Sequence, residues 1–384
     1  MSGRLGATLG TYAIGAACGL AAWAAHLPLP WLLGPLFGTG IAAALGPARP
    51  VVPGSRQLGQ AVVGSALGLY FTGEVLQAIG ESLPWMVLAS AAALATGMAG
   101  AGLMRKRAGL DPATAFYAGV PGGAADMAVF GERAGGDPSV IALAQGLRVA
   151  AVVSVLPLGL QAWGARGADL WAPQALPVTP GGLLGLAALG AAAALILGWV
   201  RFPNGWLLGP LLVSGLLTAT GHAQSAVPRP LVDLAQLLMG CALGHRFERD
   251  LIRGARVLLP AILAATVQGM LLLGAFGALL ALAWGRSVYT LLLATAPGGI
   301  AEMGLTARTL QLGVPLVTAF HVVRLISVLT LAQPVCRWWM RHFPGPRPAL
   351  RGTTAPPGLP PAGVPERGGS GGASRKAGER SEPT

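Results

Sequence analysis

The chain has 384 residues, of which 53% are hydrophobic and only 10% are charged, and its mean hydropathy is +0.63. Soluble proteins carry about a quarter charged residues, so this composition excludes an ordinary soluble globular protein. The net charge is +12, but arginines spread over short loops and helix ends indicate membrane topology signals and an anionic lipid surface, not a nucleic-acid footprint.

Apolar runs near the roughly 20 residues that cross a bilayer follow one another along the chain. In the first half we expect them at 8–26, 30–46, 57–79, 83–104, 112–131 and 138–163. In the second half we expect them at 182–200, 205–221, 231–247, 256–284, 289–307 and 314–340. The organisation predicted is a first membrane repeat at 1–163, a linker at 164–180, a second repeat at 181–341 and a disordered Pro/Gly-rich tail at 342–384.

The first run, from Leu9 to Ala25 behind Arg4, resembles a signal peptide that ends in small residues. Its counterpart at 182–200 lies in the middle of the chain, where no signal peptide is cleaved. We therefore interpret the first run as a transmembrane helix.

One unit is duplicated along the chain. The run Pro121–Met127 (PGGAADM) returns 176 residues later as Pro297–Met303 (PGGIAEM), and Trp31–Pro35 (WLLGP) returns 175 residues later as Trp206–Pro210. Proline and glycine break each Pro-Gly-Gly helix near its middle. In lipid a broken backbone is tolerated only where protein buries it or water lines it, so both breaks are expected to point inward.

Charges near the helix ends favour an inverted repeat. Glu74 and Glu81 follow the third run, whereas its counterpart is followed by arginines from 246 to 256, and the basic cluster 105–107 corresponds only to Arg286. Because excess positive charge marks one side of the membrane, these swaps place the two copies in opposite orientations. The predicted fold is an all-α polytopic membrane protein with two homologous, inverted repeats of five or six helices and broken helices at the centre.

Asp126 and Glu302 are the strongest candidates for a binding site. An isolated carboxylate at membrane depth costs several kcal/mol, and such residues usually face a cavity and serve a pathway. Freed backbone groups at the breaks supply further ligands in discontinuous helices. The alternative is that each carboxylate lies near a helix end or pairs structurally with an arginine.

Arg148 and Arg324 are the natural partners of these acids, since each lies in the following helix. Each could neutralise the acid of its own half, bind an anionic solute through its planar fork or form a structural ion pair. Gln145 and His321 stand three residues before them, on the same helix face. His321 could relay protons, although a histidine matched by glutamine is more often a polar filler.

Small residues indicate close helix packing. Gly64 and Gly68 have GxxxG spacing, and the Trp-Leu-Leu-Gly-Pro runs could either pack closely or act as a hinge, with packing favoured. Gln60 and Gln236 could contribute to the site or bond across helices.

Several chemistries lack their sequence patterns. The five histidines form no metal-ligand spacing, and no phosphate-binding loop or catalytic triad is evident. The three cysteines are far apart, in apolar runs, and are expected to be buried hydrophobes. We expect no enzyme activity, no cofactor and no metal.

With these motifs present twice, the chain resembles the AbrB membrane family over about residues 8–340. That family carries a duplicated AbrB/AmoA domain and has been labelled both ammonia monooxygenase and regulator of aidB expression. The resemblance implies a fold similar to cation/proton antiporters and anion transporters, with crossed broken helices. The monooxygenase label lacks support from metal-ligand spacing, and the soluble DNA-binding regulator of the same name is unrelated.

The leading hypothesis is a multi-pass secondary transporter or permease of the bacterial inner membrane that moves a small polar or anionic solute, coupled to protons or sodium. The alternative is a membrane-embedded regulator or sensor of gene expression. Expected partners are the lipid bilayer and a small-molecule or ion substrate, without direct nucleic-acid binding; homo-oligomerisation is left open. The predicted substrate- or ion-binding residues are Pro121, Gly122, Gly123, Asp126, Arg148, Pro297, Gly298, Gly299, Glu302, His321 and Arg324.

Overall fold

A computed structural model describes residues 2–46, 50–167, 176–223, 225–247 and 257–344. These residues form helices and connecting loops without a strand, which confirms the all-α prediction. The helices of the first half are α1 (Ser2–Ala24), α2 (Pro30–Leu45), α3 (Ser55–Gly68), α4 (Gly73–Ala108), α5 (Pro112–Gly119), α6 (Ala124–Arg133) and α7 (Pro138–Ala162). Most of the predicted tail, part of the linker and the charged residues 248–256 lie outside the described ranges.

The second half repeats this order of helices. Its described members are α8 (Pro180–Trp199), α9 (Gly205–Ala219), α10 (Arg229–Gly244), α12 (Leu258–Trp284), α13 (Val288–Thr295), α14 (Ile300–Leu310) and α15 (Val314–His342). Thus α1–α7 correspond in order to α8–α10 and α12–α15. Both halves belong to one compact unit.

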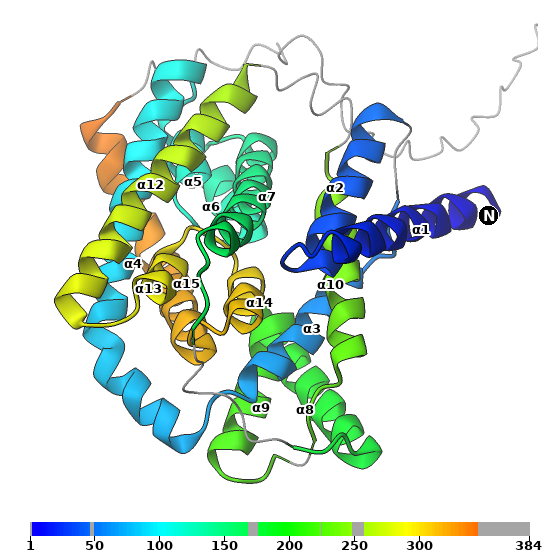
Figure 1. Cartoon of the computed structure of the whole chain (residues 1–384). Helices are drawn as coiled ribbons and strands as arrows, with labels where there is room; N and C mark the ends of the chain where they lie inside the picture. The colour runs from blue at the N-terminus through cyan, green and yellow to red at the C-terminus, as the bar shows by residue number, and fades with distance from the viewer. Residues whose placement is uncertain (1, 47–49, 168–175, 224, 248–256, 345–384) are drawn as a thin grey trace, which may run out of the picture. The chain divides into compact units, whose positions relative to one another are not determined.

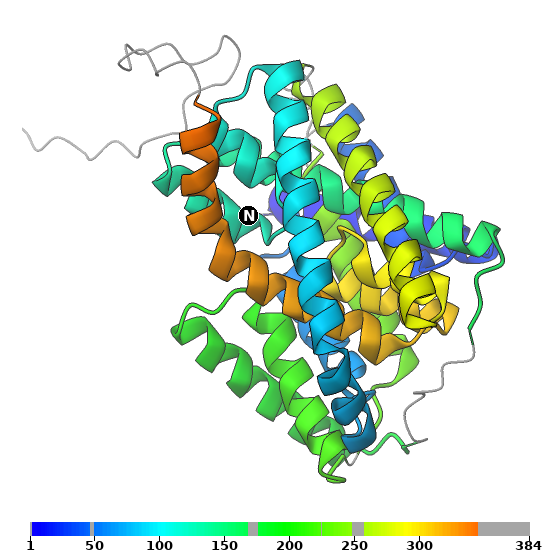
Figure 2. The ribbon, with the colours of Figure 1, turned by 90° about the vertical axis from the view of Figure 1, so that its left-hand side faces the viewer.

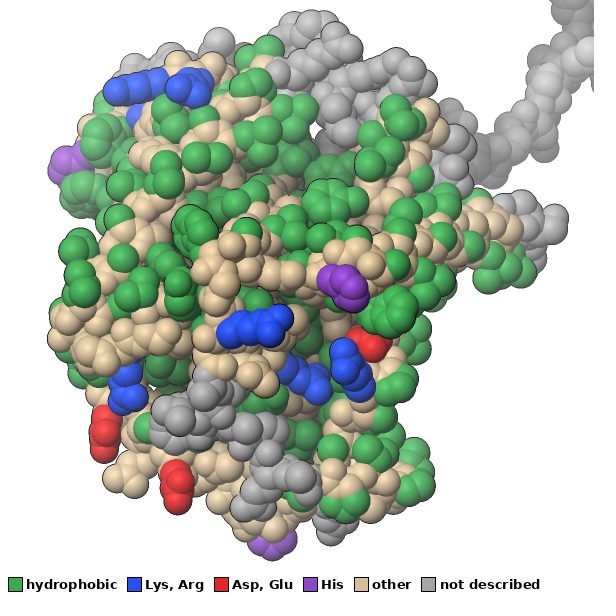
Figure 3. Space-filling model, viewed as in Figure 1, with side chains coloured by type: hydrophobic (Ala, Val, Ile, Leu, Met, Phe, Trp, Pro, Cys, Tyr) green, Lys and Arg blue, Asp and Glu red, His purple; other side chains and the backbone are tan. Residues whose placement is uncertain are grey.

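Six of the described helices are long and apolar enough to cross a membrane: α1, α4, α7, α8, α12 and α15. Two more, α2 and α9, are apolar but shorter. Hydrophobic side chains cover much of the visible surface in Figure 3, as expected where lipid is the solvent. The chain is therefore a multi-pass membrane protein by length and composition of its helices.

The expected span at 57–79 is wrong. Helix α3 ends at Gly68, and its 14 residues reach only about 21 Å, short of a bilayer core. The next helix starts early because Thr72 caps it, with its Oγ1 accepting from the Val75 amide at 3.4 Å. It then runs through Pro84 to Ala108 as one helix of 36 residues, so 83–104 is only its central part.

The helices sort into two bundles, each drawn from both halves. The scaffold bundle contains α1–α3 and α8–α10, and the broken-helix bundle contains α4–α7 and α12–α15 (Figure 1). Within the broken-helix bundle, α4 packs against both α12 and α15 (Figure 2). The main contacts between the bundles join α3 to α14 and α15, α4 to α9, and α2 to α7.

Packing and backbone conformation repeat between the halves. Helix α3 packs on α9 and, reciprocally, α10 packs on α2. Left-handed backbone recurs at matched positions, at His26 (φ 54) and Arg201 (φ 55), and again at Leu29 (φ 50) and Asn204 (φ 55). These matches agree with the duplication in the sequence. The opposite orientation of the two copies in a membrane stays a prediction.

Glycines allow the scaffold helices to touch along their backbones. A Cβ on Gly64 would lie 2.3 Å from the Leu207 carbonyl oxygen of α9, and one on Gly240 would lie 2.5 Å from the Leu32 carbonyl oxygen of α2. The Trp-Leu-Leu-Gly-Pro runs supply the partner surfaces, which supports the packing interpretation of both motifs. Small residues of this kind let helices approach closely where lipid offers no hydrophobic driving force.

Candidate functional site

The two Pro-Gly-Gly motifs break their helices as predicted. Residues 120–123 separate α5 from α6, and residues 296–299 separate α13 from α14. Proline lacks an amide hydrogen and disfavours helix at the preceding residue. The glycines leave room for the methionines, because a Cβ on Gly122 would lie 2.7 Å from the Met127 side chain and one on Gly298 would lie 2.8 Å from that of Met303. The methionine of each motif thus packs back onto its own break.

Arg148 and Gln145 satisfy the carbonyl groups freed at the first break. The Gln145 side chain, 1% exposed, donates to the carbonyl oxygens of Tyr117 at 2.7 Å and Val120 at 2.8 Å. Arg148 donates to the Val120 carbonyl oxygen at 3.4 Å and to the Gln145 side-chain oxygen. Unpaired backbone groups in lipid cost several kcal/mol, so this pair stabilises the end of α5.

Arg324 has the same role at the second break. Its guanidinium donates to the carbonyl oxygens of Ala296 and Gly298. His321, which replaces the glutamine, is fully buried, and its Nδ1 lies 2.9 Å from the Val317 carbonyl oxygen of its own helix. Because a carbonyl only accepts, Nδ1 carries the hydrogen there. The other ring nitrogen, Nε2, is buried without a partner.

Asp126 and Glu302 lie in the first turns of α6 and α14 and fold back over the helix starts. Their side-chain oxygens come within 2.4 Å and 2.0 Å of where a Cβ on Gly123 and Gly299 would lie, which explains glycine there. Asp126 is partly buried, whereas Glu302 is 2% exposed and its Oε1 has no hydrogen-bond partner. In the described chain neither acid forms an ion pair with the arginine of its own half.

A central cavity of about 650 Å³ lies between the two bundles and collects these groups. Ten of the eleven predicted site residues line it: Pro121, Gly122, Gly123, Asp126, Arg148, Gly298, Gly299, Glu302, His321 and Arg324. Pro297 does not; it is buried behind the second break. Gln145 and Gln60 also line the cavity, whereas Gln236 lies elsewhere.

The cavity also includes polar residues that the sequence analysis did not select. Its scaffold wall carries Arg56, Arg201, Asn204, His245 and Arg246. The Asn204 side-chain oxygen accepts from the Gln60 amide at 3.1 Å and so joins α3 to the start of α9. The sequence shows where the scaffold-wall residues fall in the duplicated unit, but only the packing of the helices shows that they face the broken helices.

A second cavity has a volume of about 1120 Å³. The scaffold segments that line it are the counterparts, in the duplicated unit, of those that line the central cavity. Its wall uses the α1–α2 connection and the start of α10, where the central cavity uses the α8–α9 connection and the start of α3. Its charged residues are Arg166, Arg229, Asp233 and Arg308. It reaches the end of α14 through Leu305 and Arg308, but not the break that precedes this helix.

Fold and site together define a class: a multi-pass helical membrane protein whose two broken helices meet at a polar cavity between two bundles. The family described as "Transition state regulatory protein AbrB" matches residues 7–340, nearly the whole chain. The chain belongs to this family. The resemblance seen in the motifs is thereby confirmed.

Two relatives match over most of their length. A protein of Escherichia coli (strain K12) named "Putative regulator AbrB" is 26% identical over 84% of this chain and 93% of its own. "Uncharacterized protein YhjN" of Bacillus subtilis (strain 168) is 26% identical over 87% of this chain and 93% of its own. No solved structure matches the chain.

Proposed function

We propose that the protein is a secondary transporter or permease of the bacterial inner membrane. It moves a small polar or anionic solute through the central cavity, with a proton or sodium ion bound at Asp126 and Glu302. Alternating access arises from movement of the broken-helix bundle against the scaffold bundle. The limited packing between the bundles favours such movement, because interfaces of this kind allow relative motion by default.

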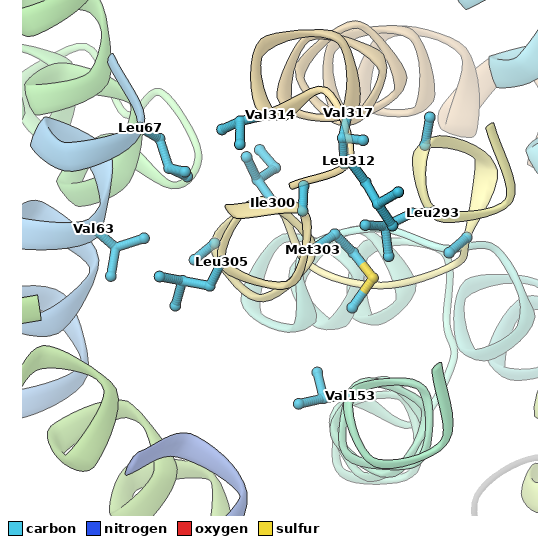
Figure 4. Close-up of a cluster of buried hydrophobic side chains, with 14 of the residues drawn as sticks. Val63, Leu67, Val153, Leu293, Ile300, Met303, Leu305, Leu312, Val314 and Val317 are labelled. Atoms are coloured by element: carbon cyan, nitrogen blue, oxygen red, sulfur yellow. The ribbon is translucent and has the colours of Figure 1, made fainter. Parts of the chain in front are cut away.

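The observation that carries this proposal is that equivalent places in the two halves are packed differently. In the second half, α14 packs against α3, and a Cβ on Gly304 would lie 2.6 Å from the Leu67 side chain. Figure 4 shows Leu67 and Val63 of α3 on the side of α14 that carries Leu305. Leu67 and Gly304 line neither the central cavity nor the second one.

In the first half the same contact is open. The counterparts of Gly304 and Leu67 are Ala128 of α6 and Leu243 of α10, and both line a cavity of about 390 Å³. Leu243 also lines the central cavity. We interpret the packed contact as a shut gate and its counterpart as an open one, as expected for one state of an alternating-access cycle. If the two halves exchanged these arrangements, the second cavity would open to the breaks in the helices. The central cavity would then close on the side where it is now open.

Cysteine cross-linking tests this exchange. In a variant without the native cysteines, Leu67→Cys/Gly304→Cys reports the shut gate and Ala128→Cys/Leu243→Cys reports the open one. We expect the first pair to cross-link faster, and we expect solute to change the two rates in opposite directions in liposomes. If solutes leave both rates unchanged, and proteoliposomes accumulate none of a panel of organic acids, amines and inorganic ions, the transporter proposal is wrong.

A membrane-embedded regulator is the second candidate, because the family description and the name of the Escherichia coli relative both include regulation. A sensor also needs a ligand cavity and two conformations, so the gates serve either function. Deletion of the chromosomal copy, followed by complementation with a transport-dead variant, distinguishes them. Restored transcript levels without restored uptake would favour the regulator.

A further inference from the structure

Four arginines from both halves of the chain line the central cavity. Arg148 and Arg324 come from opposite halves and are buried, at 7% and 8% exposed. Arg56 is partly buried and Arg246 is exposed to solvent. All four side chains line the same cavity. Buried like charges that share one cavity, as those of Arg148 and Arg324 do, are costly unless an anion balances them.

The balance of charge in the lining also favours an anion. Five arginines line the cavity, including Arg201, against two carboxylates. The N-termini of α6 and α14 face the same space, and their cap residues Gly123 and Gly299 provide no side-chain cap. Helix N-termini carry partial positive charge and bind anions through backbone amides. The excess of positive charge over the whole lining favours an anionic solute.

Unpartnered buried atoms indicate what else the ligand carries. The Nε of Arg148 is a donor without an acceptor, whereas Oε1 of Glu302 is an acceptor without a donor. Both residues line the cavity and are more than nine-tenths buried. A buried polar group without a partner costs about 1–3 kcal/mol, so the complementary ligand offers both an acceptor and a donor.

We propose that the solute of the central cavity is a small carboxylate that carries a hydroxyl group, a hydroxycarboxylate. Its carboxylate lies between Arg148 and Arg324, and its hydroxyl donates to Glu302. Arg56 and Arg246 attract it from solvent. This inference rests on the proposed function and names the substrate class of that site.

Calorimetric titration of the detergent-purified protein with matched acids tests the proposal. We expect L-malate to bind more tightly than succinate, and L-lactate more tightly than propionate, by about tenfold, because each deoxy acid leaves Glu302 Oε1 unpaired. Ethylammonium should not bind. Equal affinity within both pairs, or tighter binding of ethylammonium, would overturn the assignment.

Variants separate binding from folding. Arg148→Lys keeps the charge but removes Nε, and we expect L-malate binding to weaken about tenfold. Since Arg148 also holds a backbone carbonyl group, Arg56→Gln/Arg246→Gln supplies a second test at the cavity mouth, where we expect weaker binding at low salt and a smaller salt dependence. Arg286→Gln, a loss of charge outside the cavity, is the matched control. If Arg56→Gln/Arg246→Gln leaves the affinity for L-malate unchanged, Arg56 and Arg246 do not attract the solute from solvent.

Two further outcomes separate this inference from the proposed function. Binding of hydroxycarboxylates without uptake into proteoliposomes would support the ligand class and refute transport. Uptake of an amine with no binding of any carboxylate would do the reverse. An anionic lipid headgroup could meet the same arginines, so the titration is repeated with phosphatidylglycerol. Binding of this lipid without binding of any hydroxycarboxylate would also overturn the hydroxycarboxylate assignment.

Discussion

Gly304→Ala is expected to shift the protein out of its present conformation. The added Cβ would lie 2.6 and 3.1 Å from the two methyl carbons of Leu67 and 3.3 Å from the Thr318 hydroxyl oxygen, where carbon atoms prefer about 3.5–4.0 Å. Overpacking of this kind costs about 1–3 kcal/mol. Alanine also favours the helix, but it does so in both conformations, so only the clash distinguishes them.

The clash with Leu67 exists only while α14 packs on α3. A difference of about 1–3 kcal/mol corresponds to a population change of about 5- to 150-fold. We therefore expect the Ala128→Cys/Leu243→Cys pair, which reports the other gate, to cross-link faster by up to this factor in the Gly304→Ala background. The rate is measured in liposomes with a short bifunctional thiol reagent.

Controls decide whether the contact is a gate. Leu67→Ala added to Gly304→Ala removes the clash and should return the cross-linking rate to its starting value. Gly102→Ala, where a Cβ meets nothing within 4 Å, should leave the rate unchanged. The reasoning is refuted if Gly304→Ala lowers the melting temperature without changing the rate of the reporter pair, because the contact would then be packing alone.

Three other predictions concern the parts that support the site. Gly64→Ala should lower the melting temperature, because its Cβ would lie 2.3 Å from a backbone oxygen of α9 and overpacking costs about 1–3 kcal/mol, whereas Gly102→Ala should not lower it. Gln145→Ala should destabilise the fold by about 1–3 kcal/mol for each backbone carbonyl left unpaired, measured by denaturation in detergent; no loss would mean that water replaces the side chain. Arg324→Lys should reduce uptake of the best solute at least tenfold at similar expression, since an ammonium group cannot reproduce the fork that holds two carbonyl oxygens, and Arg286→Lys is the control.

Local chemistry made much of the fold predictable. Apolar runs of spanning length and the Pro-Gly-Gly breaks at 121–123 and 297–299 depend on residues close together in sequence. The GxxxG packing on α3 was predictable for the same reason. The end of α3 at Gly68 was not predictable in this way. Counting hydrophobic residues does not detect Thr72, the single capping residue that starts the next helix.

Only the tertiary structure decided which residues share the cavity and which gate is shut. Pairing with the acid of its own half was one expected role for each arginine, but Arg324 donates to the carbonyl oxygens of the break, where unpaired backbone groups in lipid are costly. Arg56 and Arg246 enter the site through packing between distant helices. The motif before α6 and α14 is nearly the same, yet only α14 packs on its scaffold partner. A repeated sequence supports both arrangements equally, so their difference resides in long-range contacts that no local pattern encodes.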